Sequence, residues 1–325
     1  MKKWMKAIAT MMVLSMAMTG CGGSGDSAAG DTEGKYKVGI VQQLEHPALD
    51  AATQGFQDKL TELTDGNVVF DYQNAQGEQT NCTTIATKFV SDGVDLIMAN
   101  ATTALQSAAA ATADIPIVGT SVTDYVTAGV VDSNEAPGRN VTGASDLAPI
   151  DEQIAMLMEL IPDVQKVGIV YCSAEPNSIY QSQLAQAELD KAGVAWAEYT
   201  AADSNEVQSV VTKAVSECDV LYVPTDNTMA NNTEIIKNVA VPAGVPVIAG
   251  EEGICSGCGV ATLSISYYDL GAKAAEMAYE ILANGANPAE MPVAYVSEGI
   301  TEKYNAEIAA ELNIAIPEGM VAIGE

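Results

Sequence analysis

The sequence predicts an α/β protein of two lobes, each a parallel β-sheet with helices on both faces. Three pairs of similar segments support this prediction. The letters KVGIV occur at residues 37–41 and again at residues 166–170, 129 positions later. DLIMANATTA precedes DVLYVPTDNTMA by 124 residues, and IPIVGTS precedes VPVIAGE by 130 residues. These apolar strands, alternating with helical segments, indicate two copies of one parallel α/β unit.

Residues 1–20 predict a lipoprotein signal peptide, which we exclude from the fold. Three lysines precede an apolar run from Ala7 to Met18 that is too short to span a bilayer. The letters MTGC that end at Cys21 are similar to a bacterial lipobox, with Met in place of the usual Leu. We therefore expect Cys21 to be the lipidated first residue of the mature protein; the alternative is a plain secretory signal. Residues 21–35 are rich in Gly, Ser, Ala and Asp and predict a flexible tether.

Size and charge narrow the classes of function. About 290 residues follow the tether, more than one hydrophobic core comfortably serves, which favours two lobes. The formal net charge is −29, and removal of the three signal-peptide lysines makes it −32. Such a charge repels nucleic acid, so we expect no nucleic-acid partner. Because Arg139 is the one arginine of the sequence, backbone N–H groups are the expected holders of an anionic ligand group.

Each KVGIV strand leads through a loop into a helix. After the first strand, apolar residues recur at the three-or-four spacing of an amphipathic helix: Leu49, Ala52, Phe56, Leu60 and Leu63. After the second strand, the helix is expected to end at Gly193. The segment NVTGAS then predicts a last strand of the first repeat, followed by a crossing between the lobes at Asp146.

The C-terminal part predicts elements that return to both lobes. We expect a helix over Tyr268–Gly285, a strand at residues 291–296 and a last helix near Glu302–Leu312. These elements give about three crossover strands between the lobes. The predicted lobe 1 is residues 36–145 plus 267–292, and the predicted lobe 2 is residues 146–266 plus 293–325.

Ligands of open α/β sheets bind beyond the carboxyl ends of the strands, which here predicts a site between the lobes. The candidate ligand-binding residues follow the predicted strands: Gln42, His46, Ala101, Thr102, Thr103, Thr120, Ser121, Asp146, Tyr171, Glu175, Asn177, Ser178, Asp226, Asn227 and Glu251. Hydroxyl and N–H groups near Thr102 and Ser121 suit a carboxylate. Asp146, Asp226 and Glu251 suit an ammonium, so a zwitterion such as an amino acid satisfies both sets. The alternative is that these residues are ordinary helix caps.

The sequence carries no motif of an enzyme or a cofactor site. His46, the one histidine, has no nucleophile-elbow serine around it, and no Walker loop, dinucleotide fingerprint or HExxH is present. Cys255 and Cys258 form a CxxC without a second pair or a nearby histidine. We therefore predict no catalysis, no cofactor and no metal, and leave open whether these two cysteines form a disulfide.

The segments EHPALDAATQGF, VGTSVTD, NVTGASD, AEPNS, PTDN and VIAGE together resemble the bacterial ABC-transporter substrate-binding lipoproteins of the tryptophan/tyrosine type. The resemblance covers about residues 36–322. It implies a type I periplasmic-binding-protein fold that closes on a small molecule, most often an aromatic amino acid, and delivers it to an ABC permease and its ATPase. It also implies an extracytoplasmic protein held at the cell membrane by its lipid anchor. We expect a monomer, because a cleft within one chain suffices for this role.

Two other functions stay open at this stage. The same fold binds sugars or nucleosides, whose sites usually place Trp or Phe in the cleft; here Trp4 lies in the signal peptide and Trp196 in an outer strand. A ligand-sensing partner of a membrane receptor is the second alternative. An aromatic ligand would need a stacking wall, for which Tyr125, Tyr171 and Tyr222 are candidates, although these tyrosines fit a core equally well.

Overall fold

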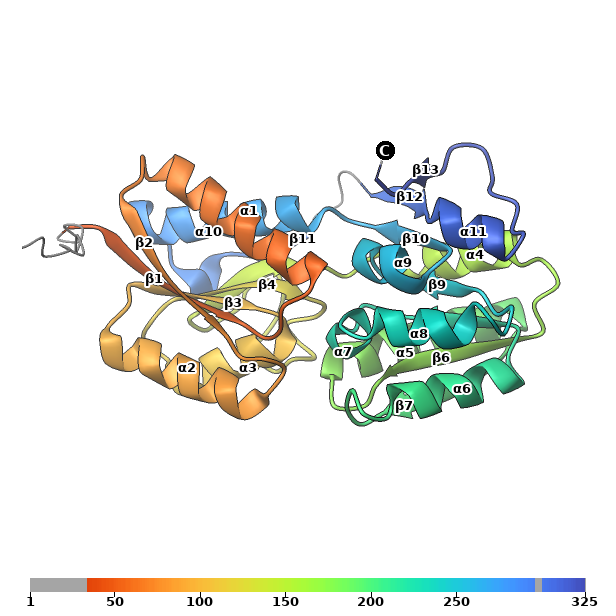
Figure 1. Cartoon of the computed structure of the whole chain (residues 1–325). Helices are drawn as coiled ribbons and strands as arrows, with labels where there is room; N and C mark the ends of the chain where they lie inside the picture. Colours follow the sequence, from red (N-terminus) through yellow and green to blue (C-terminus); the bar gives the residue numbers. More distant parts are fainter. Residues whose placement is uncertain (1–33, 296–299, 325) are drawn as a thin grey trace, which may run out of the picture. The chain divides into compact units, whose positions relative to one another are not determined.

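The computed structural model describes residues 34–295 and 300–324, and these belong to one compact unit with two β-sheets (Figure 1). The predicted signal peptide, Cys21 and most of the predicted tether lie outside the described residues and stay predictions. In the part of the chain that is described, no helix combines the length and the apolar character needed to cross a membrane.

The first sheet has six strands in the order β11-β5-β4-β3-β1-β2, and every pair is parallel. Its strands are β1 (Tyr36–Gln42), β2 (Val68–Asn74), β3 (Leu96–Asn100), β4 (Ile117–Val122), β5 (Val141–Ser145) and β11 (Ala294–Tyr295). Helices α1 (Pro47–Leu63) and α10 (Tyr267–Asn284) cover one face, and α2 (Gln79–Asp92) and α3 (Thr102–Ala111) cover the other. We call this sheet with these helices lobe 1.

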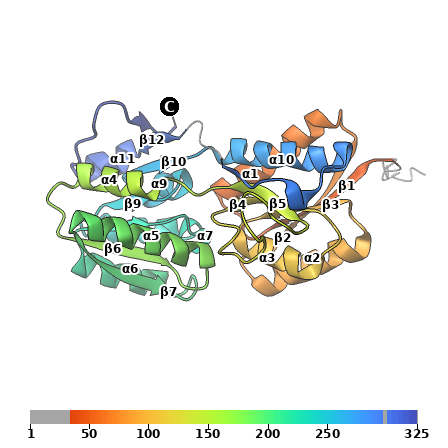
Figure 2. The same ribbon diagram turned by 180° about the vertical axis from the view of Figure 1, so that it is seen from behind.

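The second sheet has seven strands in the order β13-β12-β10-β9-β8-β6-β7. Its strands are β6 (Lys166–Cys172), β7 (Ala195–Ala201), β8 (Val220–Val223), β9 (Val247–Ala249), β10 (Ala261–Ser264), β12 (Thr301–Tyr304) and β13 (Val321–Ala322). Helices α4 (Ile150–Leu160), α5 (Pro176–Ala192) and α11 (Ala306–Glu311) cover the face seen in Figure 2. The other face carries α6 (Val207–Glu217), α7 (Asn227–Ala230), α8 (Thr233–Ala240) and α9 (Glu252–Cys258). We call this part lobe 2.

The predicted α/β fold with two similar halves is confirmed by the strand orders. The order β2-β1-β3-β4-β5 of lobe 1 repeats as β7-β6-β8-β9-β10 in lobe 2. The two KVGIV segments form β1 and β6, which take the same place in their sheets. Both faces of these strands are buried, for example Ile40 against α1 and Val41 against α2, which explains the near-continuous apolar runs. In each sheet the chain order reverses beside the KVGIV strand, the point at which such folds bind ligands.

Two glycines set how closely α1 and α10 approach each other in lobe 1. A Cβ on Gly55 would overlap the backbone carbonyl of Tyr268, and a Cβ on Gly271 would overlap that of Ala52. Only glycine permits this contact between the two helix backbones. The contact fixes the start of α10 beside α1, and it places Tyr267 close to the loop that carries His46.

The C-terminal part corrects two sequence predictions. The helix expected over Glu302–Leu312 begins only at Ala306, because residues 301–304 form β12, which pairs antiparallel with β10. The hydrogen bonds offered by the edge of β10 outweigh the helical pattern of this segment. The lobe boundary expected before residue 293 also differs from the strand pairing, since β11 pairs with β5 and stays in the first sheet.

Candidate ligand-binding site

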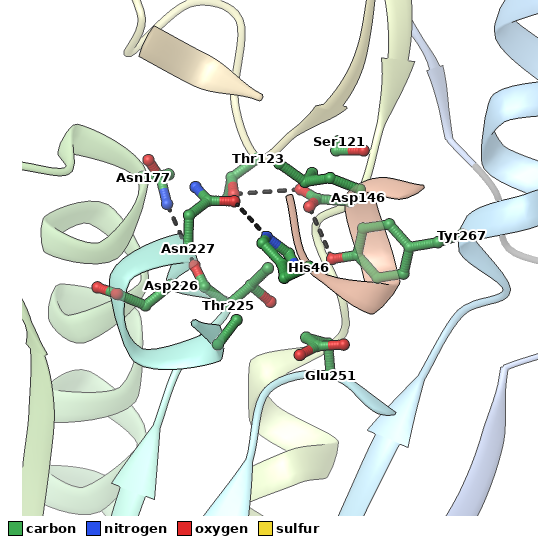
Figure 3. Close-up of a pocket in the computed structure, with 12 residues that line it drawn as sticks. His46, Ser121, Thr123, Asp146, Asn177, Thr225, Asp226, Asn227, Glu251 and Tyr267 are labelled. Carbon is green, nitrogen blue, oxygen red and sulfur yellow. Dashed lines mark hydrogen bonds between the residues drawn. The ribbon is translucent and has the colours of Figure 1, made fainter. Parts of the chain in front are cut away.

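A pocket lies where the carboxyl ends of the two sheets face each other (Figure 3). The residues that line it come from both lobes and from the first crossing: His46, Leu49, Ser121, Thr123, Asp146, Asn177, Thr225, Asp226, Asn227, Ala230, Glu251 and Tyr267. Their side chains leave a cavity of about 10 Å³, roughly the space of one water molecule. The walls of the two lobes are therefore almost in contact here.

Asp146 is the acidic residue of this pocket that caps no helix. It follows β5 directly, whereas α4 begins four residues later with Pro149 as its N-cap. Its carboxylate accepts hydrogen bonds from the Thr123 hydroxyl at 3.2 Å and the Tyr267 phenol at 2.9 Å. Burial raises the pKa of Asp146 to about 6, although both hydrogen bonds act to lower it. Because it caps no helix, this carboxylate can pair with a cation in the pocket without the loss of a helix cap.

Asp226 and Glu251 are helix caps of lobe 2. The Asp226 carboxylate accepts from the N–H groups of Met229 at 2.8 Å and Cys172 at 2.7 Å, and from the Ser178 hydroxyl at 2.7 Å. Burial raises the pKa of Asp226 above its ordinary value, and the nearby Glu175 adds to this shift. Glu251 accepts from the first N–H groups of α9, and burial raises its pKa to about 7. The contacts of these two residues are therefore those of helix caps, the alternative that the sequence left open.

A chain of hydrogen bonds links lobe 2 to His46 of lobe 1. Glu175 accepts from the backbone N–H of Asn227 at 3.1 Å and from its Nδ2 at 2.7 Å. Asn227 Oδ1 in turn lies 3.1 Å from His46 Nε2. His46 is the N-cap of α1 and precedes Pro47, which holds it at the start of the helix. Burial lowers the pKa of His46, so its ring is neutral at pH 7.

A second side-chain hydrogen bond joins the lobes through Gln181 of α5. Its Nε2 donates to the Thr123 hydroxyl of lobe 1 at 3.3 Å and to the carbonyl of Thr225 at 3.0 Å. Gln181 Oε1 accepts from the Thr225 N–H at 3.2 Å, which fixes the orientation of the amide. Since Thr123 donates to Asp146, lobe 2 is connected to that carboxylate through one hydroxyl group.

Several buried polar atoms in and beside this pocket have no hydrogen-bond partner among the described residues. His46 Nδ1, Ser121 Oγ and Asn177 Oδ1 line the pocket, and the hydroxyls of Thr102 and Thr120 belong to neighbouring segments of lobe 1. Such atoms cost about 1–3 kcal/mol each when nothing satisfies them. Ser121 also has a left-handed φ of 55°, at an irregularity in the pairing of β4 with β5. Strain of this kind is concentrated at binding sites.

The structure brings seven of the fifteen predicted site residues to the pocket: His46, Ser121, Asp146, Asn177, Asp226, Asn227 and Glu251. Three more support these residues or adjoin them. Ser178 and Glu175 hold Asp226 and Asn227 in place, and Thr102 lines a smaller space beside Asn177.

The other predicted residues lie away from the pocket. Gln42 bonds within lobe 1 to Asp50 and Thr53, Thr103 lines an outer cavity of about 520 Å³, and Ala101 and Thr120 are buried. Tyr171 lies within β6 rather than after it, and its phenol donates to Glu198 at 2.7 Å. Thr120 and Ser121 likewise lie within β4, because this strand continues to Val122.

The predicted stacking tyrosines belong to the core. Tyr125 donates to the carbonyl of Ala144 at 3.1 Å, and Tyr222 donates to Gln153 Oε1 at 2.6 Å, both fully buried. The aromatic residue that does line the pocket is Tyr267, which the sequence analysis missed. Leu49, Thr123, Thr225 and Ala230 also line the pocket and are outside the predicted set. Tyr267 lies where the chain returns from β10 of lobe 2 to α10 of lobe 1, directly after the helix cap Ser266. This position was the signal in the sequence that could have indicated it.

Two α/β lobes with a shared polar pocket at facing strand ends define a two-lobed ligand-binding protein. Comparison with known proteins identifies the family within this class. The chain belongs to the ABC transporter substrate binding protein family, whose model matches residues 37–324. It is also 39% identical over 300 residues to a tyrosine-binding protein of Clostridioides difficile, covering 90% of this chain and 86% of that protein. The neighbouring folds are type I periplasmic binding proteins, so this part of the resemblance is confirmed.

Two solved structures at similar identity differ in how well they superpose. A structure from Streptococcus pneumonia in complex with L-Trp is 33% identical with a TM-score of 0.85, covering 89% of this chain and 100% of that chain. The ligand-free, open structure of a substrate-binding protein with adhesive properties from Clostridium difficile is 38% identical, covers 89% and 99%, and has a TM-score of 0.69. The described residues are therefore arranged more like the complex than like the open form.

Proposed function

We propose that this substrate-binding protein of an ABC transporter captures an aromatic L-amino acid between its lobes. The observation that carries the proposal is the chemistry of the pocket wall. It combines a buried carboxylate that caps no helix, Asp146, with unpaired polar atoms such as Ser121 Oγ and His46 Nδ1. The described residues that line the pocket include no lysine or arginine, so an anionic ligand without an ammonium has no charged partner among them.

An amino acid satisfies these groups in a simple way. Its ammonium pairs with Asp146, close to Glu251 and the phenol of Tyr267. Its carboxylate takes hydrogen bonds from hydroxyl and backbone N–H groups near Ser121, because no guanidinium is at hand. Leu49, Ala230 and the ring of Tyr267 supply apolar surface for a side chain. Trp and Phe, which usually form the walls of sugar sites, do not line this pocket, and this favours an amino acid over a sugar.

The relatives favour an aromatic side chain. The Clostridioides difficile relative is a tyrosine-binding protein, and the Streptococcus structure holds L-Trp. These are the properties of proteins that share 33–39% of their residues with this chain. Because a cavity of about 10 Å³ admits neither ligand, the lobes must open for binding and close again afterwards.

Closure of the lobes then produces the form that the permease recognises. Each lobe provides part of the polar groups around the ligand, so only the closed form satisfies them together. The hydrogen bonds His46–Asn227 and Gln181–Thr123 join the lobes in the described residues, and we propose that closure on the ligand restores them. A permease that prefers this closed form binds the ligand-loaded protein selectively and receives the ligand from it. Substrate-binding proteins of this kind work outside the cytoplasm; we further propose a lipid anchor at Cys21, a monomeric chain, and permease and ATPase subunits as partners.

Thermal unfolding tests this function directly. Residues 22–325, which include every described element, would be refolded to remove carried-over ligand and melted with each of the twenty L-amino acids, common sugars and nucleosides. A ligand at 1,000 times its Kd adds about 4 kcal/mol to the native state, which amounts to several degrees. We expect shifts with aromatic L-amino acids. Shifts that appear only with sugars or nucleosides would contradict the proposed ligand class.

A further inference from the structure

The hydrogen bonds around Asn227 determine the orientation of its amide group. Asn227 Nδ2 lies 2.7 Å from Glu175 Oε2, and the same carboxylate accepts from the Asn227 backbone N–H at 3.1 Å. With the amide reversed, an amide oxygen would face a carboxylate oxygen, two acceptors without a proton between them. Asn227 Oδ1 is therefore the atom that faces His46 across the lobes.

The orientation of Asn227 in turn determines the tautomer of His46. Asn227 Oδ1 only accepts hydrogen bonds, so His46 Nε2 at 3.1 Å must be the donor. A neutral imidazole carries one N–H group, which leaves Nδ1 as a bare acceptor. The acidic groups that act on this ring are Glu175 and Asp50, but burial outweighs both and keeps the ring neutral. His46 is only 7% exposed, and Nδ1 has no hydrogen-bond partner in the described part of the chain.

The pocket consequently has two chemically different ends (Figure 3). At one end the Asp146 carboxylate accepts from the Tyr267 phenol at 2.9 Å, and its charge raises the pKa of both Tyr267 and Glu251. This end attracts an ammonium. At the other end His46 Nε2 lies 3.1 Å from Asn227 Oδ1, and Glu175 of lobe 2 holds that asparagine. Once the ammonium is on Asp146, the bare Nδ1 faces another part of the ligand.

We infer that His46 selects ligands whose side chain carries an N–H or O–H donor, the phenol of tyrosine or the indole of tryptophan, and rejects phenylalanine. The inference rests on the proposed function and names the specificity within that class. Sites built to hydrogen-bond a hydroxyl reject the analogue that lacks it, because a buried polar atom is then left unpaired. The acceptor is fixed as the lobes close, because Glu175 and Asn227 then hold the ring.

Two substitutions separate the roles of the ring nitrogens. In His46→Gln the terminal amide reaches the position of Nε2, so contact with Asn227 is kept and the Nδ1 acceptor is removed. In His46→Asn the amide lies at the position of Nδ1, so an acceptor is kept and contact with Asn227 is lost. Both variants would first be melted without ligand, and a midpoint close to that of the unsubstituted protein establishes that they fold.

The test is isothermal titration of the ligand-stripped chain with L-Tyr, L-Trp, L-Phe and 4-fluoro-L-phenylalanine, which approaches the size of tyrosine without its donor. We expect phenylalanine and its fluoro analogue to bind at least about 30-fold more weakly than the better of tyrosine and tryptophan. In His46→Gln this ratio falls below about fivefold through loss of tyrosine or tryptophan affinity, while phenylalanine changes little. His46→Asn retains part of the preference.

This experiment distinguishes failure of the inference about His46 from failure of the proposed function. Equal binding of phenylalanine, or a ratio unchanged in His46→Gln, overturns the selection by His46 and leaves the aromatic amino acid function standing. Tight binding of 4-fluoro-L-phenylalanine also overturns it, because size and not a donor would then decide. Absence of binding by every aromatic amino acid overturns both the inference and the proposed function.

Discussion

The two lobes share a strand order but present different chemistry to the ligand pocket. On lobe 2 the acidic groups are already occupied, because Asp226 caps α7 and Glu251 caps α9. On lobe 1 and the first crossing, Asp146 caps no helix, and His46 Nδ1 and Ser121 Oγ have no partner within residues 34–295 and 300–324. The one unpaired side-chain atom of lobe 2 among the described residues that line the pocket is Asn177 Oδ1.

This difference indicates how duplicated halves divide one function. Lobe 2 presents a rigid wall whose polar groups are held by its own helix ends. Lobe 1 with the crossing at Asp146 keeps groups that only a ligand satisfies. We therefore expect the ligand to bind first to lobe 1, after which lobe 2 closes over it. The following predictions test this division of roles, from the largest expected effect to the smallest.

Substitution of Asp146 is expected to have the largest effect on affinity. In Asp146→Asn the ligand ammonium loses its buried counter-charge, which costs about 2–5 kcal/mol, or roughly 30- to 4,000-fold in Kd. Stability should not fall, because burial already disfavours this charge in the ligand-free protein. Isothermal titration with L-Tyr measures the affinity. A Kd within threefold of the unsubstituted protein would remove Asp146 from the site.

Substitution of Asp226 is expected to produce the opposite pattern. Asp226→Ala leaves three donors inside lobe 2 without their acceptor, so the free energy of unfolding should fall by about 2 kcal/mol. Affinity for the amino acid should change less than about tenfold. Asp226→Asn is the matched control, because asparagine also caps helices well. A large loss of affinity with unchanged stability would mean that lobe 2 holds the ligand charge.

The pH dependence of binding provides a third test. Asp146 has a pKa of about 6 without ligand, against an ordinary value of 3.8, and an ammonium partner lowers it. Affinity should therefore be full above about pH 7 and fall roughly tenfold per unit below pH 6. In Asp146→Asn this fall near pH 6 should disappear. Titrations between pH 5 and 8 measure it, and a pH-independent Kd in the unsubstituted protein would contradict the role of Asp146.

Stability of the ligand-free protein should change with pH in the other direction. Asp146 and Glu251 have folded pKa values of about 6 and about 7, above the ordinary values of 3.8 and 4.5. Their contribution to stability is fully present below the ordinary values and is lost as pH rises through the folded values. The ligand-induced rise in Tm should consequently grow between pH 5 and 8. A constant rise would show that neither carboxyl group is linked to binding.

The contact between Gln181 and Thr123 is expected to have the smallest effect. Thr123→Val removes the hydroxyl that connects Gln181 with Asp146, a loss of about 1 kcal/mol, or about fivefold in affinity. The change should appear in the dissociation rate, because the contact forms only on closure. Thr123→Ser keeps the hydroxyl and should behave like the unsubstituted protein in stopped-flow experiments. An effect confined to the association rate would show that this contact forms before the lobes close.

The sequence predicts the architecture of this protein better than it predicts the residues of the site. The duplication places β1 and β6 correctly, and the rule of strand ends finds Asp146, Asn227 and Glu251. These residues were accessible because each follows an apolar strand closely: Asp146 comes directly after β5, Glu251 two residues after β9 and Asn227 four residues after β8. Whether such a carboxylate caps a helix depends on where the next helix begins, which separates Asp226 from Asp146 only in the structure.

The incorrect sequence predictions have a common cause, because contacts between residues far apart in the sequence decide these positions. Tyr171 and Tyr222 lie in strands buried on both faces, so their pattern does not distinguish core from pocket. Tyr267 was missed because the approach of α10 to α1 brings it to the site, 121 residues after Asp146. The strand β12 replaced part of a predicted helix because β10 had a free edge to pair with.

The most direct test of the division between the lobes is a crystal structure of residues 22–325 with L-tyrosine. We predict the amino acid between the lobes, its ammonium within hydrogen-bond distance of the Asp146 carboxylate, and the caps at Asp226 and Glu251 unchanged. A ligand bound with its ammonium on Asp226 or Glu251, with these helix caps broken and Asp146 bonded only to Thr123 and Tyr267, would contradict the account.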